Sequence, residues 1–137
     1  MPTAIHHLIA DLMNAWNAHD AQGVAALHAL DFVGIDVGHS RSIHGRNAFG
    51  ASSTRMFAAF PDLHFTSDVL VDQNRAAVVW MLKATHQGRI FGIPPTGCNF
   101  AVRGVSTLTI EQGLISHGLY IWDVAGFLRA VGLLPEL

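Results

Sequence analysis

The sequence predicts an α+β fold in which helices come first and a curved antiparallel or mixed sheet follows. Apolar residues recur at three- and four-residue steps in the first 60 residues, as in amphipathic helices. Residues 64–122 are instead rich in β-branched and aromatic residues and are divided by turn signals. No linker or internal repeat interrupts the chain, so residues 1–137 are predicted to form one domain, with the helices on the concave face of the sheet enclosing a pocket.

The first half predicts three helices and one strand. Residues 3–18 form an amphipathic helix, and Asp20 is a plausible N-cap for a short second helix. A strand over residues 30–37 follows. Residues 45–60 predict a third helix, with Phe49, Ser53, Met56 and Phe60 on one face. Pro61 forbids its continuation.

The second half predicts successive hairpins and a last helix. Residues 72–75 have the composition of a tight turn between two strands, and residues 111–113 have that of another. Beyond residue 123 the apolar spacing becomes helical again, and Gly132 can end that helix. The predicted strands cover residues 64–71, 76–86, 99–111 and 114–122.

Composition limits the classes of partner. Hydrophobic residues make up 50% and charged residues 13% of the chain, so we expect some apolar surface to be covered by a second copy in a homodimer. The net charge of −2, without a basic run, argues against nucleic acid. No apolar run is long enough to cross a membrane, and the start lacks the pattern of a signal peptide, so a soluble cytoplasmic protein is expected.

The strand at residues 114–122 carries the first candidate catalytic groups. A period of two places Asp123 and His117 on one face, flanking aliphatic side chains. A carboxyl group kept from water there has a raised pKa and can act as general acid and base. Asp123 also stands directly before a predicted helix, so an N-cap role is the competing interpretation.

His86 ends the strand 76–86 and forms a second candidate. With His117 it would donate hydrogen bonds to an oxyanion or pass protons, and the alternative is an ordinary half-buried histidine bonded to backbone. The histidines match no metal-ligand spacing, and we expect no metal. There is no glycine-rich phosphate loop and no nucleophile motif, so no cofactor is indicated.

Large apolar side chains are candidates for the wall of a substrate pocket that takes a small, flat hydrophobic molecule. Their alternative role is ordinary core packing. The candidate pocket residues are Trp16, Phe32, Phe57, Phe60, Trp80 and Ile121.

The loop at residues 85–97 reads THQGRIFGIPPTG. Pro94 and Pro95 fix the backbone, and Phe91 and Ile93 are unusually apolar for a solvated loop. We expect this loop to be ordered and held in place by the rest of the protein.

Several motifs in order along the chain resemble those of one family. They are WNAHD at 16–20, FPDL at 60–63, THQG at 85–88, GIPPTG at 92–97, EQGLI at 111–115 and Asp123 before Phe127-Leu128. The set resembles the SnoaL-like polyketide cyclases of the nuclear transport factor 2-like superfamily. The resemblance implies a cone-shaped, cystatin-like α+β fold that is commonly dimeric through its sheet. It also implies cofactor-free aldol ring closure, with an acid/base aspartate at the position of Asp123.

Two classes of function remain open from the sequence. The first is a cofactor-independent enzyme acting on a small hydrophobic carbonyl compound, by cyclisation, isomerisation or dehydration. The second is a noncatalytic module that binds a hydrophobic ligand or serves dimerisation. A carboxylate of Asp123 pointing into an open pocket would favour the enzyme, and a carboxylate used by the helix N-terminus would favour the binding module.

Overall fold

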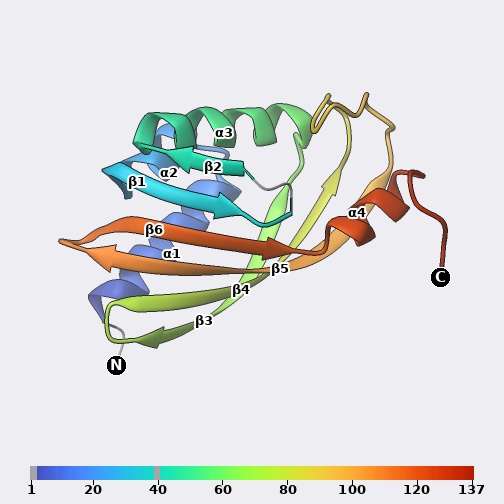
Figure 1. Cartoon of the computed structure of the whole chain (residues 1–137). Coiled ribbons are helices and arrows are strands. Elements are labelled where there is room, and N and C mark those ends of the chain that lie inside the picture. The colour runs from blue at the N-terminus through green and yellow to red at the C-terminus, as the bar shows by residue number, and fades with distance from the viewer. Residues whose placement is uncertain (1–2, 39–40) are drawn as a thin grey trace.

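A computed structural model describes residues 3–38 and 41–137, in which a six-stranded curved sheet is combined with four helices (Figure 1). The elements in chain order are α1 (Ala4–Asn17), α2 (Ala21–Ala26), β1 (His28–Asp36), β2 (Arg41–His44), α3 (Arg46–Ala59), β3 (His64–Asp72), β4 (Arg75–Thr85), β5 (Asn99–Glu111), β6 (Leu114–Trp122) and α4 (Val124–Ala130). This arrangement confirms the predicted α+β class. Among the described helices, none is long and apolar enough to cross a membrane.

The helix boundaries follow from local capping chemistry. Thr3 accepts a hydrogen bond from the backbone N–H of His6, and the His6 ring reaches back to Thr3 in a capping box. Asp20 caps α2 by accepting from the backbone N–H of Gly23, as the sequence predicted. α3 ends one residue before Phe60, and Pro61 follows.

The sheet has the strand order β2-β1-β6-β5-β4-β3. Every neighbouring pair is antiparallel except β1 and β6, which run parallel. The bounds predicted for β5 and β6 are those observed, and the turn predicted at residues 72–75 joins β3 to β4. The four-residue strand β2 was not predicted, because so short a segment shows no clear alternation of apolar and polar residues.

The helices cover the inner face of the sheet. In Figure 1, α1 lies behind the sheet, and α3 runs along the edge formed by β1 and β2. One hydrophobic cluster joins Ile9 of α1 to Phe49 of α3 and to Val78 and Leu108 of the sheet. A second cluster at the other end gathers around Phe60, Phe100 and Phe127. The space between these clusters is the cavity described below.

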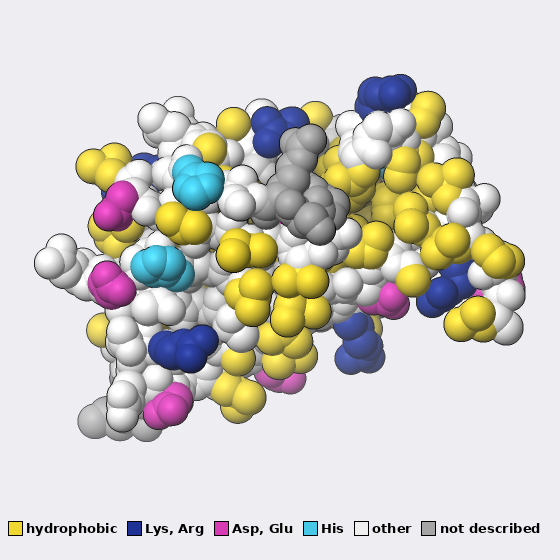
Figure 2. Space-filling view, in the orientation of Figure 1, with side chains coloured by type: hydrophobic (Ala, Val, Ile, Leu, Met, Phe, Trp, Pro, Cys, Tyr) yellow, Lys and Arg dark blue, Asp and Glu magenta, His cyan; other side chains and the backbone are white. Residues whose placement is uncertain are grey.

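The outer face of the sheet is not covered by any described helix. Figure 2 shows hydrophobic side chains gathered on this face, with charged and histidine side chains toward one end. Val105 of β5 pairs in register with Ile121 of β6 on one side and with Val79 of β4 on the other. Ile121 is 48% exposed and Val79 is 41% exposed. Ile35, which is 47% exposed, pairs with Leu119 in the adjacent row. The apolar surface expected from composition is therefore present on the outer face of the sheet.

Candidate functional site

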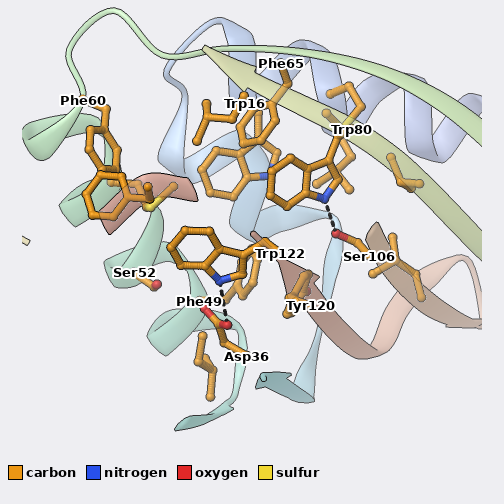
Figure 3. Close-up of a pocket in the computed structure, with 18 of the residues that line it drawn as sticks. Trp16, Asp36, Phe49, Ser52, Phe60, Phe65, Trp80, Ser106, Tyr120 and Trp122 are labelled. Carbon is orange, nitrogen blue, oxygen red and sulfur yellow. Dashed lines mark hydrogen bonds between the residues drawn. The ribbon is translucent and has the colours of Figure 1, made fainter. Parts of the chain in front are cut away.

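A cavity of about 160 Å³ lies between α1, α3 and the inner face of the sheet (Figure 3). An apolar cavity of this size accommodates roughly one aromatic ring, and a larger ligand would extend through the open mouth. The wall is mainly aromatic and contains all three tryptophans of the chain. Its aromatic residues are Trp16, Phe49, Phe60, Phe65, Trp80, Phe91, Phe100, Tyr120, Trp122 and Phe127. Such a wall favours a flat hydrophobic ligand.

Three polar side chains lie in one row across the floor of the cavity. Asp36 of β1 pairs in register with Tyr120 of β6, and Tyr120 pairs with Ser106 of β5. All three line the cavity. Because neighbouring strands lie about 4.8 Å apart, the backbones of Asp36 and Ser106 are about 10 Å apart. The floor therefore presents a carboxylate, a phenol and a hydroxyl in order.

Two tryptophans orient the outer members of this row. The indole N–H of Trp122 donates to Asp36 Oδ1 at 2.9 Å, and the backbone N–H of Gly38 donates to the same oxygen at 2.8 Å. The indole N–H of Trp80 donates to Ser106 Oγ at 3.0 Å (Figure 3). Since Ser106 Oγ accepts this bond, its own hydroxyl proton is available to donate elsewhere. One end of the floor is thus an acceptor and the other a donor.

The ring positions on the floor depend on glycines in the strands. Trp80 pairs in register with Gly104, and a Cβ at that glycine would collide with the indole. A Cβ at Gly118 would likewise collide with the Tyr120 hydroxyl. The glycines let both rings lie flat along the sheet, which keeps the cavity open.

The Tyr120 hydroxyl is buried and has no hydrogen-bond partner among the residues that the structure describes. Burial raises the pKa of this phenol above its usual value, and the nearby charge of Asp36 raises it further. Tyr120 is therefore a neutral hydrogen-bond donor at physiological pH.

His28 contributes a neutral imidazole to the wall. The side chain is 1% exposed, and its ring centroid lies 4.2 Å from that of Phe49 and 4.8 Å from that of Phe32. Nδ1 donates to the carbonyl of Val24 at 2.7 Å, so Nε2 carries the lone pair. Burial lowers the pKa of His28 to about 4, against the opposing effect of the Val24 hydrogen bond and with a smaller contribution from the charge of Arg46. This ring is an acceptor and not a cation at pH 7.

The structure places Asp123 outside the cavity. The residue is exposed and is the N-cap of α4, where Oδ1 accepts from the backbone N–H of Gly126 at 2.8 Å. The geometry therefore supports the N-cap role of Asp123, which the sequence offered as the alternative to catalysis. Asp123 is not among the lining residues.

His117 and His86 do not form a pair in the cavity. His117 is exposed, with Nδ1 3.1 Å from Ser116 Oγ. His86 is fully buried, with Nδ1 3.0 Å from Thr96 Oγ1 and Nε2 without a partner in the described part of the chain. Its ring packs near Phe60 and Phe127, behind the cavity wall.

A bulge explains why the predicted face of β6 was wrong. Thr109 pairs with His117, but Ile110 pairs with Ile115, so Ser116 is an extra residue on β6. Ile115 therefore points into the core while His117 and Ile121 point to the outer face. Alternation counted from Ile115 assigned the wrong side to every later residue, including Tyr120 and Trp122.

The predicted pocket residues divide into two groups. Trp16, Phe60 and Trp80 line the cavity. Phe32 is fully buried in the core beside Phe49, and Phe57 is half-buried against Trp16, so neither lines the cavity. Ile121 lies on the outer face of the sheet and is a wrong prediction for the same reason as His117.

Four functional candidates on the floor and wall were missed from the sequence. Asp36 lies one residue before the end of the strand predicted over residues 30–37, whose faces were not assigned. The predicted alternation in residues 114–122 left Tyr120 and Trp122 on the face opposite His117. Ser106 gave no signal of its own. A glycine inside a strand often marks the close approach of a ring, so Gly104 and Gly118 are the signal that would have located the cavity floor.

In residues 3–38 and 41–137, no three histidine, cysteine, aspartate or glutamate side chains are grouped so that they could hold a metal ion.

Comparison with solved structures defines the class of fold. A protein of unknown function from Burkholderia pseudomallei K96243, described as nuclear transport factor 2-like, superimposes with a TM-score of 0.79 at 16% identity, covering 95% of this chain and 98% of that one. A candidate SnoaL-like polyketide cyclase from Jannaschia sp. CCS1 superimposes with a TM-score of 0.87 at 20% identity, covering 98% and 95%. The fold is therefore nuclear transport factor 2-like.

The family model for SnoaL-like polyketide cyclases matches residues 6–131. This chain belongs to the SnoaL-like polyketide cyclase family. IdmH of Streptomyces antibioticus, described as a candidate polyketide cyclase, is 25% identical and superimposes with a TM-score of 0.77 over 92% of this chain and 96% of that one. No curated protein matches the sequence.

Proposed function

We propose that the cavity binds a small, flat, hydrophobic carbonyl compound and that Asp36 removes a proton from the carbon beside the carbonyl, without a cofactor. The observation that carries this proposal is the polar row on an otherwise apolar floor, with a carboxylate at one end and a hydroxyl donor at the other. Removal of that proton begins cyclisation by aldol closure, and it also begins isomerisation and dehydration.

The spacing of the row suits this chemistry. A base oxygen, an α-carbon, the adjoining carbonyl oxygen and a hydroxyl donor together span about 8 Å at contact distances. Asp36 and Ser106 lie two strands apart, about 10 Å between backbones, and their side chains rise from the same face. The Ser106 hydroxyl would donate to the carbonyl oxygen as negative charge develops there, which lowers the barrier.

We assign proton removal to Asp36 and not to Asp123 because Asp36 lines the cavity and Asp123 does not. Among the described residues that line the cavity, Asp36 alone carries a carboxyl group. Asp123 follows β6 as the N-cap of α4, is exposed and does not line the cavity. His117 and His86 are likewise not assigned to the reaction.

A noncatalytic binding module is the second candidate. Asp36 Oδ1 already accepts two N–H bonds, and most of the wall is apolar, which suits a site that holds a ligand without transforming it. The two candidates differ in proton exchange and not in binding.

The experiment uses 1-tetralone, a flat bicyclic ketone with exchangeable protons beside its carbonyl. Binding is followed by quenching of the three cavity tryptophans, and exchange of the α-protons in D₂O is followed by mass spectrometry. Asp36→Asn keeps the shape and the acceptor oxygen, and we expect it to retain binding and to lose about 10²-fold or more of the protein-dependent exchange. Asp123→Asn is the matched control and should exchange as the wild type does.

Three outcomes separate the alternatives. Binding without protein-dependent exchange in the wild type would support the binding module. Loss of exchange in Asp123→Asn, with Asp36→Asn unaffected, would return the catalytic role to Asp123. Equal exchange in all three proteins would refute both assignments.

We further propose that a second copy covers the outer face of the sheet in a homodimer. Exposed Ile121, Val79 and Ile35, in two adjacent rows on a face that no described helix covers, support this. Ile121→Asp should lower the mass measured by analytical ultracentrifugation, and a monomeric wild type would refute the dimer.

We also propose that the protein resides in the cytoplasm. The unpaired Cys98 fits a reducing compartment of this kind.

A further inference from the structure

The loop between β4 and β5 contains a tight turn with an unusual residue. Ile90 and Ile93 exchange two backbone hydrogen bonds, of 3.2 Å and 2.8 Å, around Phe91 and Gly92. Phe91 has φ of 53° and Gly92 has φ of 74°, and positive φ at both central positions defines a type I′ turn. Glycine and asparagine adopt this backbone readily, whereas an aromatic side chain at the first central position is strained.

The rest of the loop is held in place by the body of the protein. The backbone N–H of His86 donates to the carbonyl of Cys98 at 2.9 Å, and that of Gly97 donates to the carbonyl of His86 at 2.8 Å. Gly88 packs so closely on the end of α3 that a Cβ would lie 2.6 Å from the Ala58 carbonyl oxygen. In Figure 1 this loop projects at the same end of the molecule as α4. The strained turn is therefore presented from a fixed base.

The strain places the Phe91 ring at the mouth of the cavity. The ring lines the cavity and is still 42% exposed. Its centroid lies 5.8 Å from that of Trp122 and 6.1 Å from that of Phe127. The Trp122 indole donates a hydrogen bond to Asp36. The Phe91 ring, next to Trp122, therefore lies near the acceptor end of the polar row. A large exposed area remains that a ligand in the mouth would bury.

We infer that Phe91 is a ligand-contacting residue that closes on the flat face of the bound molecule and determines affinity, and that its strained backbone is retained for this contact and not for the stability of the fold. The inference rests on the ligand class in the proposed function, but it needs neither Asp36 nor catalysis. A planar ligand in the mouth would stack against the exposed side of the Phe91 ring, next to Trp122.

The chain contains a matched control for the backbone effect. Gln112 and Gly113 form the turn between β5 and β6 with φ of 53° and 76°, nearly the same φ values as those of Phe91 and Gly92. Gln112 is exposed and is not among the residues that line the cavity. A change to asparagine relieves the same backbone strain at Phe91 and at Gln112. Only the change at Phe91 also removes a ring from the cavity.

The experiment compares Phe91→Asn, Gln112→Asn and Phe91→Tyr with the wild type. Titrations of 1-tetralone and of the apolar dye 1-anilinonaphthalene-8-sulfonate measure binding, and thermal unfolding measures stability. We expect Phe91→Asn to weaken binding of 1-tetralone about three- to tenfold, while Gln112→Asn binds as the wild type does. Phe91→Tyr keeps the ring and should lie closer to the wild type than Phe91→Asn does.

The stability arm tests why the strain is kept. Gln112→Asn should raise Tm by about 1–3 °C. Phe91→Asn should unfold at or above the wild-type Tm, because the relief of strain offsets the lost ring contacts. A Phe91→Asn protein that unfolds well below the wild type would show that the ring is structural and would overturn the inference.

The two proposals fail in different ways. Equal binding of both probes by the wild type and Phe91→Asn would overturn the inference and leave the proposed function intact. Loss of dye binding in Phe91→Asn, when the wild type binds dye but not 1-tetralone, would support the inference and refute the carbonyl ligand. A wild type that binds neither probe would overturn both.

Discussion

The neutral state of His28 predicts that stability falls when the pH is lowered. This imidazole is buried between Phe32 and Phe49, and its pKa is lowered from 6.5 to about 4. Above about pH 7 the ring is neutral in both the folded and the unfolded chain. Between pH 6.5 and pH 4 the unfolded chain takes up a proton that the folded chain resists. Stability must therefore fall as the pH falls through this window and level off below it.

The size of the effect follows from the two pKa values. Between pH 7.5 and pH 5, the free energy of unfolding should fall by about 2 kcal/mol through His28 alone. A loss of this size is a large fraction of the stability of a domain, about 5–15 kcal/mol.

Urea unfolding followed by tryptophan fluorescence at pH 7.5, 6 and 5 measures this loss. His28→Gln keeps an N–H donor for the Val24 carbonyl but does not titrate, so its loss over the same range should be smaller by about 2 kcal/mol. The comparison is made within each protein, so any constant effect of the substitution cancels. Parallel losses in the two proteins would refute the reasoning.

Three further changes test other parts of the structure. Asp123→Ala removes the N-cap of α4 and should lower stability by about 1 kcal/mol without altering ligand binding, as measured by urea unfolding and titration; reduced binding would contradict the external position of Asp123. Gly104→Ala forces the Trp80 indole to move, so it should cost about 1–3 kcal/mol and shift the tryptophan emission; unchanged emission would refute the close packing. Pro94→Gly should lower stability by about 0.4–1 kcal/mol through the unfolded state, and an unchanged melting curve would argue against an ordered loop.

The elements of the fold could be predicted from the sequence because their signals are local. Thr3, Asp20 and Pro61 mark helix ends by capping chemistry and by the lack of a backbone donor. The turns at residues 72–75 and 111–113 divide the strands by composition alone. These features depend on a few neighbouring residues, which a single sequence displays.

The site was harder to predict because it depends on register. One extra residue, Ser116, reverses the faces of β6 and moves His117 and Ile121 outward, so the predicted pair with Asp123 is lost. Asp36 reaches the cavity because β1 pairs in parallel with β6, a pairing between distant segments that no local pattern encodes. The positions of Trp16, Phe60 and Trp80 on the cavity wall could be predicted, since large aromatic residues on inner faces either fill a core or line a cavity.

The hydrogen bond between Asp36 and Trp122 joins residues that are 86 positions apart. The polar row therefore cannot assemble until the last strand has docked beside the first, and closing so long a loop is a slow, entropically opposed step. A chain shortened before β6 would lack Tyr120, Trp122 and the whole of α4, so the polar row would have no middle member. A ligand that bridges the row would in turn hold the two halves of the chain together, so resistance to proteolysis should increase with its concentration.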